Sequence, residues 1–407
     1  MAIALAVKEA LAGSSMIRKM FEEGNELKKK HGADKVFDFS LGNPDIEPPD
    51  AFRKVFLRMA EDDAAGKTKG KHGYMPNAGF PGVRETLAKK ASADHQCTVP
   101  PAHIIMTAGA AGGLNVVFKS ILNPGDEVIV PKPYFVEYRN YIKNHGGKLT
   151  EAATKPDFAL DLKEIEKLLS SKTAAILINS PNNPTGKVYT EQDIAALAAV
   201  LRLHGTKTGR FPYLVSDEPY REIVYNGITA PPVLAAYEES IIVTSYSKSL
   251  SLPGERIGYI AVGPDAGEKQ DLLDALIYAN RVLGFVNAPA LMQRIVAELQ
   301  NEKVEIAIYD RRRNAFKEVL DNAGLTYAEP EGAFYFFVKV PERKSGGKII
   351  TDDGAFSACL KKHLILGVPG SGFAGPGWIR FAYCIDEKII RASSNAFKAA
   401  VDEWLND

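Results

Sequence analysis

The fold of this chain is indicated by residues 245–258, which read SYSKSLSLPGERIG. They follow the apolar run IIVT at 241–244, which predicts a buried strand ending just before Lys248. Removal from water would lower the pKa of this lysine and let its amine form a Schiff base with a carbonyl. Ser245, Ser247 and Arg256 flank it, and hydroxyls and guanidinium groups bind phosphate. An amine ringed by phosphate ligands suggests the cofactor pyridoxal 5′-phosphate (PLP).

A motif this short also occurs around solvated lysines, so the interpretation depends on three further segments. Residues 216–220 read SDEPY and follow an apolar run that predicts another core strand. PLP withdraws electrons while its ring nitrogen is protonated, and a buried carboxylate such as Asp217 would hold that proton. Tyr220 would donate to the phenolic oxygen of the ring. By itself, the same segment is more typical of a turn.

The other two segments are connections that follow predicted strands. Residues 179–186 read NSPNNPTG, an irregular turn in which the amide of Asn183 would reach the ring oxygen. Residues 106–113 read MTAGAAGG and precede a helical pattern at 114–122. Small residues at a helix start let backbone N–H groups approach a phosphate. This segment matches neither a P-loop nor a dinucleotide fingerprint, and a plain strand-to-helix turn remains an alternative.

Composition and charge argue against several classes of protein. The 407 residues are enough for two domains, and 50 Lys and Arg balance 50 Asp and Glu, so no net charge attracts nucleic acid or an anionic membrane. The three cysteines, Cys97, Cys359 and Cys384, and the seven histidines show neither a disulfide framework nor the spacing of a metal site. Apolar runs are too short to span a membrane, and residues 1–11 do not resemble a signal peptide. We therefore expect a cytoplasmic protein without a metal.

Apolar runs alternate with helical patterns, which predicts an α/β fold with a mostly parallel sheet flanked by helices. The predicted strands are residues 104–107, 127–130, 148–152, 174–178, 213–216, 241–244 and 259–262. A helix over 190–203 would begin with a variant capping box at Thr190 and Asp193. Asn183, Asp217 and Lys248 all follow predicted strands, and ligands of open α/β sheets bind outside the carboxyl ends of strands.

A smaller α+β domain is expected to be formed by the N-terminal and C-terminal segments. Residues 265–320 predict a long helical stretch leading to it, and the aromatic run at 332–338 predicts a strand. The glycine-rich residues 370–377 predict a loop before a strand at 378–382. The expected division assigns residues 1–50 and 312–407 to the small domain and residues 51–311 to the large PLP-binding domain.

Taken together, these segments resemble the class I/II aminotransferases of PLP fold type I, the aspartate aminotransferase-like superfamily, from LGNP at 41–44 to Arg380. The resemblance implies that Lys248 holds the cofactor as an internal aldimine, while Asp217, Asn183 and Tyr220 bind the ring. It further implies contacts to the phosphate and ring face from Ser245, Ser247, Arg256, Gly109, Ala110, Ala111, Tyr134 and, across a subunit interface, Tyr74. Arg380 would bind the substrate α-carboxylate, with help from Gly42 and Asn43.

The resemblance implies a homodimeric enzyme of amino-acid metabolism that moves an amino group from an L-amino acid to a 2-oxo acid. Lys248 would also act as general base for the Cα proton. A PLP-dependent carbon–sulfur lyase of the same fold would use nearly the same residues, and its products would distinguish it. An effector-binding half of a transcription regulator would need a DNA-binding domain, for which the roughly 35 residues before FDFS at 37–40 are too few.

The amino donor is the least defined part of the expectation. Some aspartate-acting relatives place a lysine near the position of Ala111, and others receive an arginine from the partner subunit. Arg281 lies near the segment that supplies this arginine, but its register is displaced by about a residue, and a plain helix-surface position is an alternative. We expect a neutral or aromatic donor with Tyr134 and Phe373 shaping the pocket, and 2-oxoglutarate as acceptor. Aspartate is the main alternative.

Overall fold

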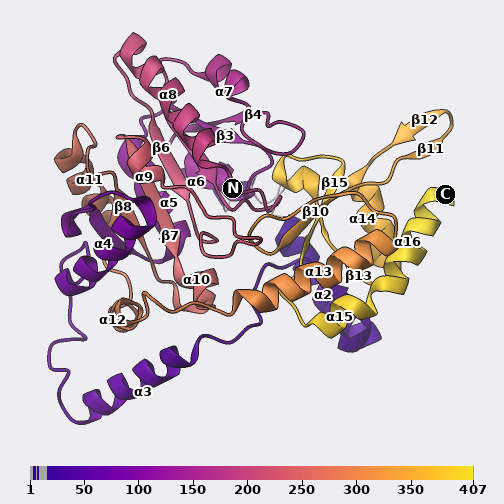
Figure 1. Ribbon diagram of the computed structural model, residues 1–407, viewed down its shortest axis with the longest axis horizontal. Helices are drawn as coiled ribbons and strands as arrows, with labels where there is room; N and C mark the ends of the chain where they lie inside the picture. Colours follow the sequence, from indigo (N-terminus) through magenta and orange to yellow (C-terminus); the bar gives the residue numbers. More distant parts are fainter. Residues whose placement is uncertain (1–2, 6, 9–15, 407) are drawn as a thin grey trace.

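A seven-stranded sheet forms the centre of the computed structural model, which describes residues 3–5, 7–8 and 16–406 (Figure 1). In the order of the sheet, its strands are β2 (Ile104–Thr107), β8 (Gly258–Val262), β7 (Ser240–Ser245), β6 (Tyr213–Asp217), β5 (Thr173–Asn179), β3 (Glu127–Pro131) and β4 (Lys148–Ala152). All seven predicted strands are confirmed, and so is the α/β fold class.

One strand runs against the others. β8 pairs antiparallel with both β2 and β7, whereas the remaining pairs are parallel. The start of β8 therefore lies at the edge where its neighbours end, with Gly258 opposite both Ser245 and Thr107. This reversal brings the residues just before β8 to the same edge as the ends of β5, β6 and β7.

Helices cover both faces of this sheet, which explains why its strands are apolar on both sides. All residues of β5 are buried, and they alternate between two cores. Ile176 belongs to the core under α4 (Pro81–His95) and α8 (Glu191–Thr208), and Leu177 to the core under α5 (Gly109–Ile121) and α11 (Lys269–Val282). The predicted capping box at Thr190 and Asp193 is formed at the start of α8.

The second body of the molecule combines the two ends of the chain. Its antiparallel sheet has the order β14 (Val368–Pro369), β15 (Trp378–Ala382), β10 (Tyr335–Lys339) and β9 (Tyr327–Ala328). It is packed by α13 (Ile306–Asn322), α14 (Asp353–Lys362), α15 (Glu387–Ala392) and α16 (Ser394–Asn406). β1 (Phe37–Asp38) pairs with β13 (Ile365–Leu366), and α2 (Met16–His31) packs beside β14.

Some predicted boundaries are wrong. Residues 265–320 are divided among three helices, α11, α12 (Ala290–Glu298) and α13. Gly284, with φ +89°, and Pro289 interrupt the helical pattern between α11 and α12, and residues 299–305 separate α12 from α13. The strand predicted at 332–338 begins at Tyr335, since Ala333 has φ +58°. The helix predicted at 114–122 begins at Gly109. A 3₁₀ turn, Gly370–Phe373, lies within the predicted loop at 370–377.

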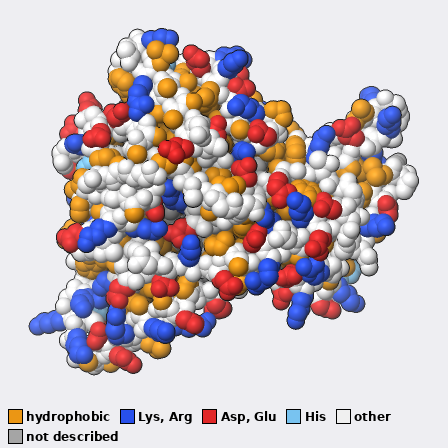
Figure 2. Space-filling model, in the orientation of Figure 1, with side chains coloured by type: hydrophobic (Ala, Val, Ile, Leu, Met, Phe, Trp, Pro, Cys, Tyr) orange, Lys and Arg blue, Asp and Glu red, His pale blue; other side chains and the backbone are white. Residues whose placement is uncertain are grey.

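The remaining elements are short or peripheral. They are α3 (Asp50–Ala64), α6 (Tyr138–Asn144), α7 (Leu162–Leu168), α9 (Val233–Ala236), α10 (Tyr246–Ser249) and the hairpin β11 (Arg343–Ser345) and β12 (Lys348–Ile350), with 3₁₀ turns at Ala33–Lys35, Pro101–His103 and Pro253–Glu255. Figure 1 shows α3 standing apart from the central body. On the face seen in Figure 2, acidic and basic side chains are interspersed. None of the helices within the described ranges is long and apolar enough for a membrane span.

Candidate active site

A cavity of about 540 Å³ lies at the edge of the sheet where β5, β6 and β7 end. It receives side chains from the large sheet, from α5 and from the small domain. The expected site residues that line it are Gly42, Ala110, Ala111, Asn183, Asp217, Tyr220, Ser245, Ser247, Lys248, Arg256 and Arg380. The chain therefore brings most of the predicted constellation into one cavity.

Asp217, the last residue of β6, presents a buried carboxylate at this cavity. Tyr138 donates to its Oδ2 at 2.5 Å, whereas its buried Oδ1 has no hydrogen-bond partner among the described residues. Asn179, at the end of neighbouring β5, donates to the backbone carbonyl of Asp217 at 2.8 Å. Burial, reinforced by the charge of Glu218, raises the pKa of Asp217 to about 7. A cationic N–H donor at Oδ1 would offset the cost of ionising this buried carboxylate and lower its pKa again.

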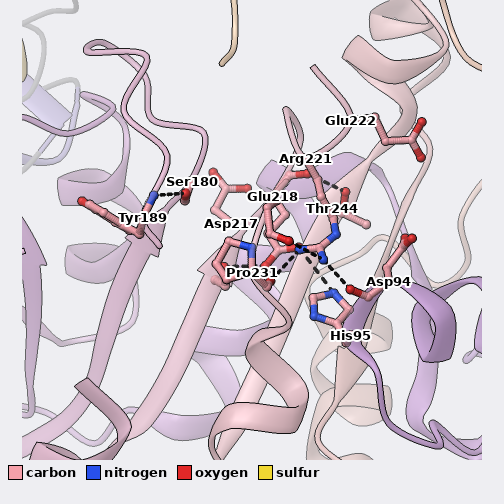
Figure 3. Close-up of polar contacts among 12 residues, drawn as sticks. Asp94, His95, Ser180, Tyr189, Asp217, Glu218, Arg221, Glu222, Pro231 and Thr244 are labelled. Carbon is pink, nitrogen blue, oxygen red and sulfur yellow. Dashed lines mark hydrogen bonds and ion pairs between the residues drawn. The ribbon is translucent and has the colours of Figure 1, made fainter. Parts of the chain in front are cut away.

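Glu218 follows Asp217 but takes part in a separate buried network (Figure 3). Its carboxylate lies 3.0 Å from Arg221 and 3.4 Å from His95, and Ser216 donates to it at 2.8 Å. Burial acts to raise the pKa of Glu218, but Arg221, His95 and Ser216 outweigh it and lower this pKa to about 2. Adjacent residues at a strand end face opposite sides. The network thus anchors the backbone behind Asp217 without occupying the cavity.

Lys248 lies in the one-turn helix α10, directly after β7. Its Nζ donates to the carbonyl oxygen of Gly42 at 2.7 Å. Burial, with smaller effects from Arg380 and Arg256, lowers the pKa of this amine to about 8. Roughly a tenth of the amine is therefore neutral at pH 7, far more than of an ordinary lysine, and the neutral state is the one that a nucleophile and general base requires.

One corner of the cavity is suited to a phosphate. Arg256 stands just before β8, and the reversal of that strand places it beside the start of α5. A Cβ added at Gly109, which has φ +73°, would lie 3.0 Å from a guanidinium nitrogen of Arg256, so only glycine allows this approach without displacing the arginine. The Ser245 hydroxyl lies 3.2 Å from that of Ser247. The backbone N–H groups at the start of α5 add positive potential.

Arg380, in β15, is almost fully buried and stands between two aromatic rings. Its guanidinium carbon lies 4.7 Å from the ring centroids of Tyr335 and Phe373. It donates to Asn183 Oδ1 at 3.0 Å and to the Ser40 carbonyl at 2.6 Å, while its Nε has no partner. Among the described ion pairs none includes Arg380, so its charge lacks a carboxylate. A buried cation of this kind favours an anionic ligand.

Asn183 and Tyr220 stand between the carboxylate site and Asp217. Since the Oδ1 atom of Asn183 accepts from Arg380, its amide nitrogen remains to donate to a ligand. The hydroxyl of Tyr220 lies 2.7 Å from that of Tyr335. Both residues are buried and line the cavity, so they stand where hydrogen bonds to a ring oxygen are expected.

Other expected residues do not line this cavity. Tyr134 lies outside the wall, and its hydroxyl donates to Glu151 at 2.9 Å and accepts from Arg139 at 2.8 Å. Its neighbour Phe135 lines the wall instead. Phe373 reaches the site only through Arg380. The residues that lie outside the wall are Tyr74, which is 94% exposed, Asn43, Gly109 and Arg281.

Four aromatic residues of the cavity escape the sequence interpretation. Tyr138 begins α6 and binds Asp217, Tyr141 lies one turn further along α6, and Phe135 precedes both in the same connection after β3. Tyr335, in β10, contacts both Tyr220 and Arg380. A position after a strand was the available signal for Phe135 and Tyr138. For Tyr335 the signal was an aromatic run, which is also typical of an ordinary core strand.

The residues present fit PLP. The unpartnered Oδ1 atom of Asp217 suits the protonated ring nitrogen, and the desolvated amine of Lys248 suits the aldehyde. Arg256, the two serine hydroxyls and the start of α5 suit the phosphate. When bound, this cofactor supplies an electron sink for the substrate, a chemistry that no protein side chain provides.

Comparison with known proteins agrees with this geometry. Residues 34–394 match the model of the family described as aminotransferase class I and II. A probable aspartate/prephenate aminotransferase of Aquifex aeolicus is 32% identical over 395 residues, which cover 94% of each chain. An aminotransferase structure from Eubacterium rectale has a TM-score of 0.93 and 34% identity, with full coverage of both chains. A Thermus thermophilus aspartate aminotransferase structure with maleate has a TM-score of 0.81 and 28% identity, covering 95% of this chain and 97% of that one.

Proposed function

This chain belongs to the aminotransferase class I and II family and is a PLP-dependent transaminase, and we propose that it acts on a neutral or aromatic L-amino acid. Arg380 supports this proposal because it is a buried cation without a carboxylate partner in the described chain. It would orient the amino donor by binding its α-carboxylate. Its planar guanidinium would bind the α-carboxylate through two parallel hydrogen bonds. A 2-oxo acid, with 2-oxoglutarate as the expected acceptor, would bind in the same way.

The other side chains have complementary roles in this proposal. Lys248 would hold the cofactor through its amine, and the same Nζ would serve as general base for the Cα proton of the substrate and as general acid when that proton is returned. Asp217 keeps the ring nitrogen protonated, with Tyr138 fixing the orientation of its carboxylate. Asn183 and Tyr220 donate to the ring oxygen. Phe135 would add an apolar surface to the cavity wall.

The proposed donor class follows from the charges on the cavity wall. Within the described chain, the cations that line the cavity are Lys248, Arg256 and Arg380, and each is assigned to the cofactor or to the α-carboxylate. Glu137 also lines this wall, and its carboxylate would repel a second carboxylate nearby. A neutral side chain therefore fits the cavity of a single chain better than an acidic one.

Aspartate is a second candidate, favoured by the relatives. Those of Aquifex aeolicus and Thermus thermophilus carry aspartate in their names, and the Thermus protein was crystallised with the dicarboxylate maleate. A second cation would then have to come from a partner subunit. Arg281 is exposed on α11, where it stacks on Tyr278 at 5.6 Å, and could reach a neighbouring cavity.

A panel of amino donors separates the two candidates. With 2-oxoglutarate as acceptor, we expect kcat/KM for leucine, alanine or phenylalanine to equal or exceed that for aspartate. An aspartate preference above about a hundredfold, or ~2.7 kcal/mol of transition-state discrimination, would overturn the neutral-donor proposal. Loss of aspartate activity alone in Arg281→Ala would then identify the missing carboxylate partner.

Replacing Arg380 with lysine will lower kcat/KM for all amino donors alike, by roughly 10- to 100-fold. Lysine keeps the charge but cannot form two parallel hydrogen bonds, each worth about 1.5–3 kcal/mol to a charged group. Cofactor affinity, measured by fluorescence titration of the apoenzyme, should change little. The matched control is Arg256→Lys, which should weaken cofactor binding. Selective loss of acidic donors in Arg380→Lys would place this residue at the side-chain pocket instead.

We also propose that the enzyme is a homodimer with shared active sites. Tyr74 is 94% exposed and lies outside the cavity of its own chain, as a residue that completes a neighbour's site would. The nearby helix α3 has no buried residue, and its Phe56 and Leu57 are 44% and 61% exposed. An exposed apolar surface of this kind favours a protein interface.

Subunit mixing tests the shared site. Tyr74→Phe and Lys248→Ala would each impair a homodimer, but a mixed dimer would contain one site with both native residues. We expect an equal mixture, after exchange, to recover up to about a quarter of wild-type activity, since roughly half of the dimers would be mixed. Mixing wild type with Lys248→Ala should give only the average. An active monomer at high dilution would refute the proposal.

A cytoplasmic location completes the proposal. None of the cysteines forms a disulfide in the described chain, as is usual in reducing compartments. Cell fractionation with an antibody against the native protein would test this assignment, and recovery in a secreted or membrane fraction would contradict it.

A further inference from the structure

Tyr335 owes its position to the register of the small sheet. In β10 and β15, Tyr335 stands opposite Ala382 and Phe337 stands opposite Arg380. Directly opposed residues, and residues two apart on one strand, share a face of a sheet. Tyr335 and Arg380 are therefore diagonal neighbours on the same face, within reach of each other's side chains. This face closes one side of the cavity.

The Tyr335 hydroxyl contacts two parts of the site at once. It lies 2.7 Å from the Tyr220 hydroxyl, in a buried pair of tyrosines whose rings meet edge to face at 5.7 Å. It also packs against Gly42, where an added Cβ would clash with the Tyr335 oxygen. Gly42 is the residue whose carbonyl accepts the hydrogen bond from Lys248. If Tyr220 donates its proton to a ligand, Tyr335 is the group placed to donate to Tyr220.

The Tyr335 ring has a second contact, with the substrate side of the cavity. It supports one face of the Arg380 guanidinium, and Phe373 supports the other, each at 4.7 Å. The two rings leave the planar group little freedom to rotate. Cation–π contacts of a desolvated guanidinium also offset part of the free-energy cost of burying its charge.

We propose that Tyr335 is a positioning residue for both halves of the site: its hydroxyl donates to Tyr220, and its ring orients Arg380. The hydroxyl strengthens the hydrogen bond from Tyr220 to the ring oxygen, because donors in a chain polarise one another. The ring keeps the planar guanidinium of Arg380 in the orientation that two parallel hydrogen bonds to a carboxylate require. The first function rests on the ring-oxygen role proposed above for Tyr220, and the second rests on the carboxylate role proposed above for Arg380.

The hydroxyl is tested by Tyr335→Phe, which keeps the ring. The readout is the pH titration of the absorbance of the lysine-bound cofactor. Weaker donation to the anionic ring oxygen favours the protonated form, so the midpoint should rise by about 0.4–1 pH unit, the size of one hydrogen bond. In a Tyr220→Phe background the same substitution should produce less than about a third of this shift. No shift, or equal shifts in both backgrounds, would overturn the proposal.

Tyr383→Phe is the matched control for the hydroxyl. It removes another buried tyrosine hydroxyl of the small domain, one that donates to Tyr225 at 3.1 Å away from the cavity, and should leave the midpoint unchanged. The ring is tested by comparing Tyr335→Leu with Tyr335→Phe. KM for the donor should rise about tenfold with leucine and less than threefold with phenylalanine. If Arg380→Lys leaves KM intact, the carboxylate role fails while the titration still decides the hydroxyl.

Discussion

Replacing Lys248 with alanine will lower kcat/KM for every donor by about 10⁴-fold or more. The variant loses both the covalent anchor and the group that moves the Cα proton, and general acid–base catalysis alone contributes up to about 10⁴-fold. Lys248 is the one lysine among the described residues that lines the cavity, so no neighbouring amine can replace it. The absorbance of the lysine-bound cofactor should disappear in this variant. The rate of the half-reaction with excess donor, measured by stopped flow, should fall with it.

A control variant and a rescue experiment sharpen this prediction. Lys269→Ala removes a lysine whose amine donates to the carbonyl of Pro264 on an exposed surface, and should keep full activity. A small primary amine added to Lys248→Ala should restore part of the proton transfer, since the space left by the side chain opens into the cavity. Unchanged turnover by Lys248→Ala would rule out its assigned role.

Replacing Asp217 with asparagine will have two opposite effects, on activity and on the stability of the apoenzyme. An amide cannot retain the proton on the ring nitrogen, and loss of such an electrostatic partner costs about 10²–10³-fold in kcat. The apoenzyme should nevertheless become more stable at pH 8. The pKa of Asp217 is raised to about 7, so the folded state pays for ionising this carboxylate as pH rises from about 4 to 7. We expect a gain of roughly 3–4 kcal/mol above pH 7 and none near pH 4.

The adjacent carboxylate provides the matched control with the opposite sign. The pKa of Glu218 is lowered to about 2, so its ionised form stabilises the folded state above about pH 4 and this contribution is lost as pH falls toward 2. Glu218→Gln leaves Arg221 and His95 without a buried anion and should destabilise the apoenzyme by about 3–5 kcal/mol at pH 8. Urea unfolding at pH 4 and pH 8 measures both variants. Equal destabilisation by both would contradict the separation of their roles.

The central sheet could be predicted from sequence because most of its strands are short apolar runs buried on both faces, the edge strand β4 being the exception. β5 is buried throughout, and its residues alternate between two cores, so hydrophobicity alone identifies it. The region 265–320 was harder, since helical periodicity continues across the breaks near Gly284 and Pro289. The reversal of β8 was also beyond prediction, because strand direction depends on pairing and not on composition.

For the site, the sequence indicates which residues lie at the cavity where they follow a strand, but not where strand register decides their position. Asp217, Asn183 and Lys248 stand at the cavity because the carboxyl ends of parallel strands meet at one edge. Tyr335 reaches it only through the pairing of β10 with β15, which the sequence does not specify. Phe135 lines the cavity and Tyr134 does not, and the sequence of neighbouring aromatic residues in a turn gives no indication of which one faces inward.

The pairing of β1 with β13 joins segments from opposite ends of the chain, so the small domain cannot be completed until the C-terminal segment has been synthesised. Asp217, Lys248 and Arg256 belong to the sheet that is complete once β8 has emerged, whereas Tyr335 and Arg380 are made later. Domains fold as units from the N-terminus during translation. We therefore expect a nascent chain to assemble its cofactor pocket first and to acquire the means of choosing a substrate only near release.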